Sequence, residues 1–177
     1  MALACSAWLG CASDATEAGS GVPASAYKNA PSTLEGWNLF EDVRNMRPGP
    51  RMLPYDVIAP LFSDYAQKHR FVYVPEGEKI RYDATDMWQF PTGSILVKTF
   101  SYADAEDTTR ERLLETRLIV FAADEVQTHT YVFTADQSSN ARKVAGASLS
   151  VRFRDPMGEV RDNSYRVPNT NQCLECH

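Results

Sequence analysis

Short runs of alternating apolar and polar residues, separated by turn residues, dominate the chain from Arg70 to Arg161. A two-residue alternation places successive side chains on opposite faces of a strand, and it does not fit the 3.6-residue repeat of a helix. We predict strands at residues 70–74, 79–82, 87–90, 94–101, 113–122, 126–134, 149–154 and 159–161. Because helical segments do not alternate with these strands, the sequence predicts a mainly β protein, an antiparallel β-sandwich or barrel-like domain.

Turn residues between these runs predict which strands pair. Pro75 to Glu78 would join residues 70–74 to 79–82 in a hairpin. A second hairpin would pair 113–122 with 126–134, and a third would turn at 155–158.

One short helix is predicted ahead of the strands. Ser32 or Thr33 is a suitable N-cap, and the prolines of RPGP end the helix. Its apolar stripe would be formed by Leu34, Trp37, Leu39, Phe40 and Val43.

The N-terminal region is apolar and then rich in small residues, which is typical of an export signal followed by a tether. Cys11, after Trp-Leu-Gly, resembles the lipid-bearing cysteine of a bacterial lipobox, and Cys5 is a second candidate. We therefore expect residues 1–31 to be a signal remnant and flexible tether, with a lipid anchor at Cys11 or Cys5. A plain N-terminal tail with two incidental cysteines is the alternative.

The 177 residues suffice for one domain with a core, which we place at 32–165. The formal net charge is −5, and no run of Lys or Arg would follow a phosphate backbone. This excludes nucleic acid as an expected partner.

The chain closes on NQCLECH, in which Cys173, Cys176 and His177 have the C-x-x-C-H spacing of a c-type haem attachment site. The two thiols would form thioethers with the porphyrin, and the imidazole would be the proximal iron ligand. We therefore predict haem c as the cofactor, with His177 as its metal ligand.

Other interpretations of this motif remain open. A thioredoxin-like C-x-x-C is expected near a βαβ unit, and a zinc site would need a fourth ligand. The two other histidines, His69 and His129, are isolated in the sequence. A sixth haem ligand would have to come from elsewhere, and Met157 and His129 are candidates, although each also fits a structural role.

The longer pattern resembles the N-terminal region of a family of bacterial exported di-haem c-type cytochromes. The resemblance rests on YDVIAPLFSDYAQKHRFVYVPEG, WQFPTGSILVKTF, ETRLIVF, HTYVF and VPNTNQCLECH, in that order. In that family the chain continues into a helical region with a second haem motif. The resemblance thus implies that residues 166–177 are the start of a truncated cytochrome domain.

A second resemblance is to the cytochrome P460 and cytochrome c′-beta group, in which a β-rich domain holds a haem attached near its C-terminus. It rests on Phe90-Pro91-Thr92-Gly93 and on Val97-Lys98. We expect Lys98 itself to be a strand lysine that points to solvent.

Three functions follow as hypotheses. The first is an exported electron carrier, periplasmic or anchored to the outer membrane, with an unidentified redox partner. The second is a haem enzyme acting on peroxide or small nitrogen oxides, with His69 or His129 as acid or base. The third is an extracellular binding module with an appended haem, using aromatic residues such as Trp37, Trp88 and Tyr131. We also expect Cys173 to His177 to form a loose segment outside the β domain.

Overall fold

The computed structural model describes residues 21–174. It is mainly β with antiparallel sheets, consistent with a β-sandwich, which confirms the predicted fold class. The elements are η1 (Leu34–Trp37), β1 (Phe40–Asp42), β2 (Arg47–Pro48), β3 (Met52–Pro54), β4 (Gln67–Tyr73), β5 (Ile95–Ala103), β6 (Glu111–Phe121), β7 (Val126–Phe133), β8 (Asn140–Arg142), β9 (Ala147–Arg154), β10 (Val160–Val167) and α1 (Thr170–Leu174).

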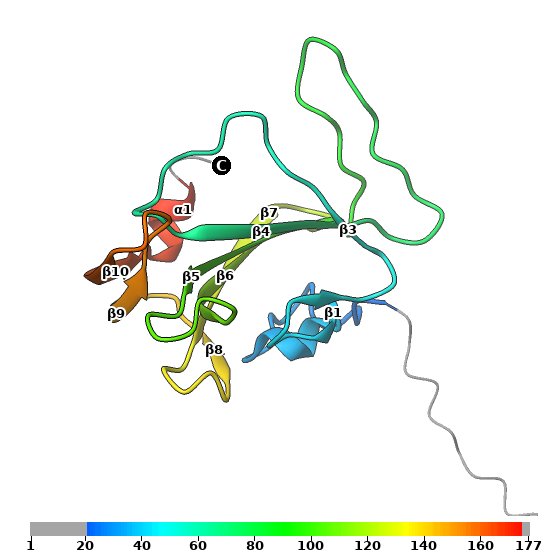
Figure 1. Ribbon diagram of the computed structural model, residues 1–177. Helices are drawn as coiled ribbons and strands as arrows, with labels where there is room; N and C mark the ends of the chain where they lie inside the picture. The colour runs from blue at the N-terminus through cyan, green and yellow to red at the C-terminus, as the bar shows by residue number, and fades with distance from the viewer. Residues whose placement is uncertain (1–20, 175–177) are drawn as a thin grey trace, which may run out of the picture.

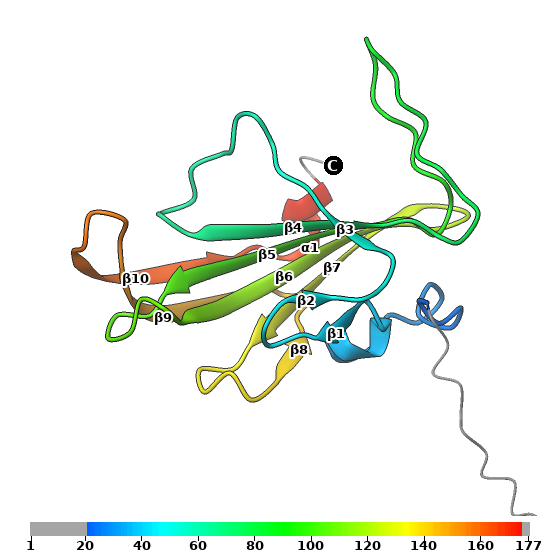
Figure 2. The same cartoon turned by 45° about the vertical axis from the view of Figure 1, so that its right-hand side comes forward.

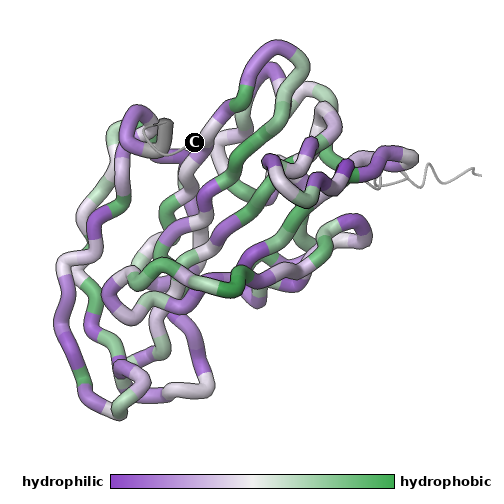
Figure 3. Tube along the Cα trace, turned by 90° about the horizontal axis from the view of Figure 1, so that it is seen from above, coloured by the Kyte–Doolittle hydropathy of each residue, from purple (hydrophilic) through white to green (hydrophobic). Residues whose placement is uncertain are grey.

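A six-stranded sheet in the order β3-β4-β5-β6-β7-β8 is the centre of the molecule. The N-terminal segment with η1, β1 and β2 covers one face, and the β9–β10 hairpin covers part of the other (Figures 1 and 2). We call these the first and the second face. Hydrophobic and hydrophilic segments alternate along the strands in Figure 3.

Strand β5 shows how this alternation builds two cores. Ile95 and Val97 pack into the core of the first face, and Phe100 and Tyr102 pack into that of the second. Because successive side chains of a strand point to opposite sides, one sheet supplies both cores.

A β-bulge in β6 changes this alternation. Phe100 lies opposite Glu115 and Ser101 lies opposite Leu113, so that Leu114 has no partner in the ladder. Leu114 packs into the second core and Glu115 is hydrogen-bonded to a residue of that core, Tyr165. The bulge therefore directs two consecutive side chains toward the β9–β10 hairpin.

The predicted helix after Ser32 is wrong beyond its first turn. The structure has one 3₁₀ turn, η1, which ends at Asn38 in the left-handed conformation (φ 53°) and leads into β1. Tertiary contacts fix this turn: the backbone N–H of Leu34 donates to Asn140 Oδ1 and Trp37 Nε1 donates to the Tyr131 hydroxyl. The five residues of the predicted stripe are nevertheless all buried.

The predicted pairing of 70–74 with 79–82 is also wrong. Strand β4 pairs with β3 and β5, and Arg81 instead forms an isolated bridge with Gln89. The turn itself is present, since the N–H of Glu78 donates to the Pro75 carbonyl. A turn is a local property, whereas the partner of β4 was decided by the long β5. The other two predicted hairpins are confirmed as β6–β7 and β9–β10.

Both boundaries of the domain differ from those we expected. Ala26 is buried in the core of the first face, and the Tyr27 hydroxyl donates to the Gly93 carbonyl at 2.7 Å. At the other end, β10 continues to Val167, which is 2% exposed. The folded unit thus includes residues that the sequence had assigned to the tether and to the cytochrome segment.

Candidate functional site

The short helix α1 follows β10 and contains the first cysteine of the C-x-x-C-H motif, Cys173. Asn169 and Gln172 cap its start reciprocally. The backbone N–H of Gln172 donates to Asn169 Oδ1 at 2.9 Å, and the N–H of Asn169 donates to Gln172 Oε1 at 3.0 Å. This is a capping box, in which side chains three residues apart bond each other's backbone. The sequence N-T-N-Q carries this signal, although we did not predict a helix here.

Helix α1 is attached to the sheet. It packs against β7, and the N–H of Thr170 donates to the Val144 carbonyl at 3.1 Å. A Cβ at Gly146 would lie 2.6 Å from the Val167 carbonyl oxygen, so only glycine permits this approach. Of the loose segment that we expected at Cys173 to His177, the structure describes residues 173 and 174, and these two belong to α1.

Four residues of the predicted haem and lipid sites are not described by the structure. Cys176 and His177 lie outside the described residues, as do Cys5 and Cys11. The predictions of a haem ligand and of a lipid anchor stay predictions.

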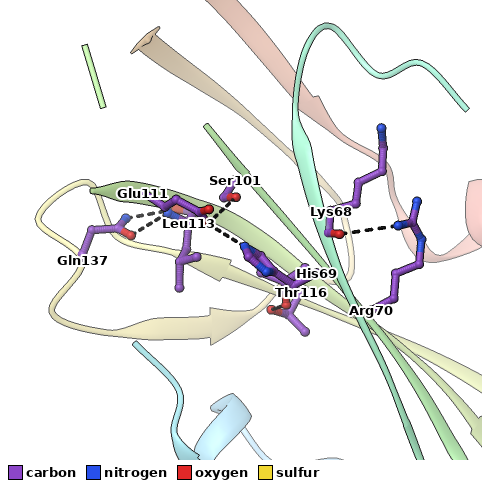
Figure 4. Close-up of polar contacts among 9 residues, drawn as sticks. Lys68, His69, Arg70, Ser101, Glu111, Leu113, Thr116 and Gln137 are labelled. Carbon is purple, nitrogen blue, oxygen red and sulfur yellow. Dashed lines mark hydrogen bonds and ion pairs between the residues drawn. The ribbon is translucent and has the colours of Figure 1, made fainter. Parts of the chain in front are cut away.

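His69 lies on the first face, in a hollow of about 410 Å³ lined by Arg44, Arg110, Glu111 and Gln137, among others. His69 Nε2 is 2.5 Å from Glu111 Oε2, and the Ser101 hydroxyl donates to the same oxygen at 2.8 Å (Figure 4). Glu111 thus separates the serine from the histidine. His69 does not act as a base toward Ser101, and the arrangement is not that of an activated nucleophile.

His129 also lies on the first face, where its ring packs against Trp37 with centroids 5.5 Å apart. Burial, followed by the nearby Arg142, lowers the pKa of His129 from 6.5 to about 4. Its imidazole is therefore neutral at pH 7 and packs as an aromatic residue.

Met157 lies in the turn of the β9–β10 hairpin and is 68% exposed. This turn is at the far end of the hairpin from α1, because Val160 pairs with Arg154 and Val167 pairs with Ala147. Seven strand residues correspond to about 24 Å. The distance makes Met157 an unsuitable ligand for a haem held at Cys173.

The aromatic residues divide into core and surface. Trp37 and Tyr131 are fully buried and hydrogen-bonded to each other at 2.6 Å, so they belong to the core. Trp88 is 53% exposed and packs against Tyr82, at the end of a long loop. This loop and the one before β4 extend from the body of the molecule (Figures 1 and 2).

Comparisons with family models, with curated proteins and with solved structures find no match to this chain. Residues 21–174 contain no helix with the length and apolar character needed to cross a membrane. Within the same range, no three His, Cys, Asp or Glu side chains gather in a way that could hold a metal ion.

Proposed function

We propose that the protein is an exported c-type cytochrome that carries a covalently bound haem and transfers electrons. The observation that carries this proposal is the C-x-x-C-H spacing of Cys173, Cys176 and His177 at the end of the chain. The cysteines would form the thioethers and His177 would ligate the iron. When bound, the haem supplies a one-electron couple, and the chain's own residues hold and shield it.

One feature of the described residues supports this proposal. The motif begins in a capped helix that packs against the sheet, so its first cysteine is held by the fold.

The placement of the histidines speaks against the haem-enzyme alternative. His69 and His129 lie on the first face, whereas β10, which leads into α1, lies on the second. His69 is held by Glu111, and His129 packs against Trp37. Neither is aimed at the side of the sheet where β10 lies.

A binding module is favoured by a different observation, the apolar tips of the two long loops. Ile58, Leu61, Phe62, Met87 and Trp88 are all at least half exposed. Grouped apolar side chains on a surface commonly mark contacts with another protein or domain. Such a contact is compatible with an electron carrier, which must dock on a redox partner.

We also propose export, because haem attachment to cysteines requires reduced thiols in the compartment to which the chain is exported. A lipid at Cys11, or at Cys5, would anchor the mature protein. Mass spectrometry of the mature N-terminus would detect a diacylglyceryl cysteine, and an unmodified terminus at both positions would contradict the anchor.

The haem proposal is tested by exporting the full chain in a bacterium that has a haem-attachment system. We expect haem that stays with the protein through acid–acetone extraction, and its loss in the double variant Cys173→Ala, Cys176→Ala. The variant Cys5→Ser, Cys11→Ser, fused to a separate signal peptide, should retain haem. If the wild-type chain keeps no haem after extraction, the proposal is wrong.

A further inference from the structure

The hollow that contains His69 is built by four separate segments of the chain. They are the β1–β2 turn, strand β4, the end of the β5–β6 turn together with the start of β6, and the β7–β8 turn. Its volume of about 410 Å³ lies within the range of about 300 to 1,000 Å³ that is usual for small-molecule sites. We call it the His69 hollow.

Two walls of the His69 hollow have an unusual backbone that other contacts hold in place. Met46 has φ 48° and Gln137 has φ 60°, a region that residues other than glycine rarely adopt. The Met46 side chain is buried in the core of the first face. The Gln137 amide donates to the carbonyls of Leu113 and Thr134, and it accepts from the N–H of Leu113 (Figure 4). The β1–β2 and β7–β8 turns are therefore fixed without a ligand.

Glu111 is the only carboxylate among the described residues that line the His69 hollow. Its Oε2 lies 2.5 Å from His69 Nε2 and accepts a hydrogen bond from the fully buried Ser101 hydroxyl (Figure 4). About two thirds of the Glu111 and His69 side chains are buried, since they are 32% and 33% exposed. Glu111 is therefore engaged by His69 and Ser101 rather than by an arginine.

Two arginines line the same hollow, Arg44 from the β1–β2 turn and Arg110 from the β5–β6 turn. Both are exposed, and within residues 21–174 neither has a carboxylate at ion-pair distance. Asp104 and Asp107 are influenced by Arg110. Hydrogen bonds within their own turn lower the pKa of both carboxyls first, and Arg110 lowers it further. The guanidinium groups of Arg44 and Arg110 thus retain their capacity to bind an anion.

The charge of the His69 hollow is opposite to that of the whole protein. Two arginines and one glutamate leave one positive charge, or two when His69 is protonated, in a chain of formal net charge −5. A guanidinium group presents paired N–H donors that match a carboxylate or a phosphate. No Phe, Tyr or Trp is among the described residues that line the hollow. Charge and hydrogen bonds, rather than ring stacking, would therefore select its ligand.

We propose that the His69 hollow binds a small polar molecule that carries a carboxylate or a phosphate group. Arg44 and Arg110 bind the oxygens of this group, and the contacts of Met46 and Gln137 keep the walls in position. Glu111, held by His69 and Ser101, sets the polar character of the rest of the hollow. The inference is independent of the proposed electron transfer, because none of these residues belongs to the closing motif.

Isothermal titration calorimetry on the full chain at low ionic strength tests the proposal. The probes are succinate, inorganic phosphate and succinamide, which is the uncharged counterpart of succinate. We expect at least one of the two anions to bind with one site per chain, and succinamide not to bind. The two anions distinguish a carboxylate ligand from a phosphate ligand. If neither anion binds, or if succinamide binds as well as succinate, the proposal is wrong.

Arg44→Gln and Arg110→Gln test the location of the site, with Arg152→Gln as the matched control. Arg152 is exposed on β9 and does not line the hollow. Each variant of the hollow should raise the dissociation constant of the bound anion about tenfold or more, as expected for the loss of a charge-assisted hydrogen bond. Arg152→Gln should leave it nearly unchanged.

The thermal midpoint of each variant serves as the check on folding, and we expect it to stay near that of the wild type because neither Arg44 nor Arg110 is in an ion pair of the described chain. Equal weakening by Arg152→Gln would show a general attraction of anions to the protein and would overturn the site. Unchanged affinity in Arg44→Gln or in Arg110→Gln would overturn it as well.

Discussion

The buried carboxylate Glu115 depends on one hydroxyl group of the β9–β10 hairpin. Its side chain is 0% exposed, and it accepts hydrogen bonds from the Tyr165 hydroxyl at 2.6 Å and from Arg117 Nε at 3.0 Å. Burial, and then Glu115, raise the pKa of Tyr165 well above its usual value. The phenol is therefore protonated at neutral pH and donates to Glu115.

We predict that Tyr165→Phe lowers the free energy of unfolding by about 1.5 to 3 kcal/mol, the usual contribution of a hydrogen bond to a charged group. The substitution removes one oxygen and leaves the ring contacts with Phe100 and Tyr102 in place. A protein of this length loses about 2 to 4 °C of thermal midpoint per kcal/mol, so the midpoint should fall by about 3 to 12 °C. Urea unfolding followed by circular dichroism measures the change, and the slope m should stay constant.

Tyr102→Phe is the matched control. Tyr102 lies in the same core, and its hydroxyl accepts a hydrogen bond from the neutral amide of Asn163 at 3.0 Å. A neutral hydrogen bond contributes about 0.5 to 1.5 kcal/mol. If Tyr165→Phe costs no more than Tyr102→Phe, the buried charge of Glu115 does not depend on the phenol, and the role we assign to Tyr165 is refuted.

Three further predictions concern other parts of the molecule. The pKa of His129 falls from 6.5 to about 4 on folding, so the unfolded chain binds a proton at this site at a higher pH than the folded protein does. The free energy of unfolding should therefore decline as the pH drops from about 6.5 to about 4. His129→Gln should make this decline smaller, as measured by urea titrations at each pH. Tyr131→Phe removes the acceptor of Trp37 Nε1 and should cost about 1 to 3 kcal/mol by chemical denaturation, whereas a cost below about 0.5 kcal/mol would contradict the bond. Deleting residues 168–177 removes α1 from β7 and should lower the midpoint of the haem-free protein in calorimetry, contrary to the loose segment that the sequence predicted.

The strand predictions succeeded where the sequence signal was local. The alternation in 113–122 and 126–134, with a turn between them, predicted β6 and β7 closely. The apolar stripe after Thr33 predicted burial correctly but not the element, because η1 is set by contacts with Asn140 and Tyr131, about a hundred residues away in the chain. The local spacing of apolar residues predicts which side chains are buried, whereas long-range packing determines the backbone conformation that buries them.

The candidate site shows the same contrast between local sequence signals and long-range packing. The proposal of haem attachment at Cys173, Cys176 and His177 rests on their spacing, which is a short contiguous motif that the sequence alone displays. Lys98 looked like a solvent-exposed strand lysine in the sequence, and only its neighbours in the sheet reveal a different environment.

The sequence by itself determined the class of fold and the two faces of each long strand, because each follows from residues that are close together in the chain. Only the tertiary structure decided that Arg70, Lys98 and Arg117 lie side by side and that the hairpin leading to the motif covers the same face. Strand register is set by side chains packing across the sheet, and a shift of one residue in any one of these strands would send the cation of that strand to the opposite face.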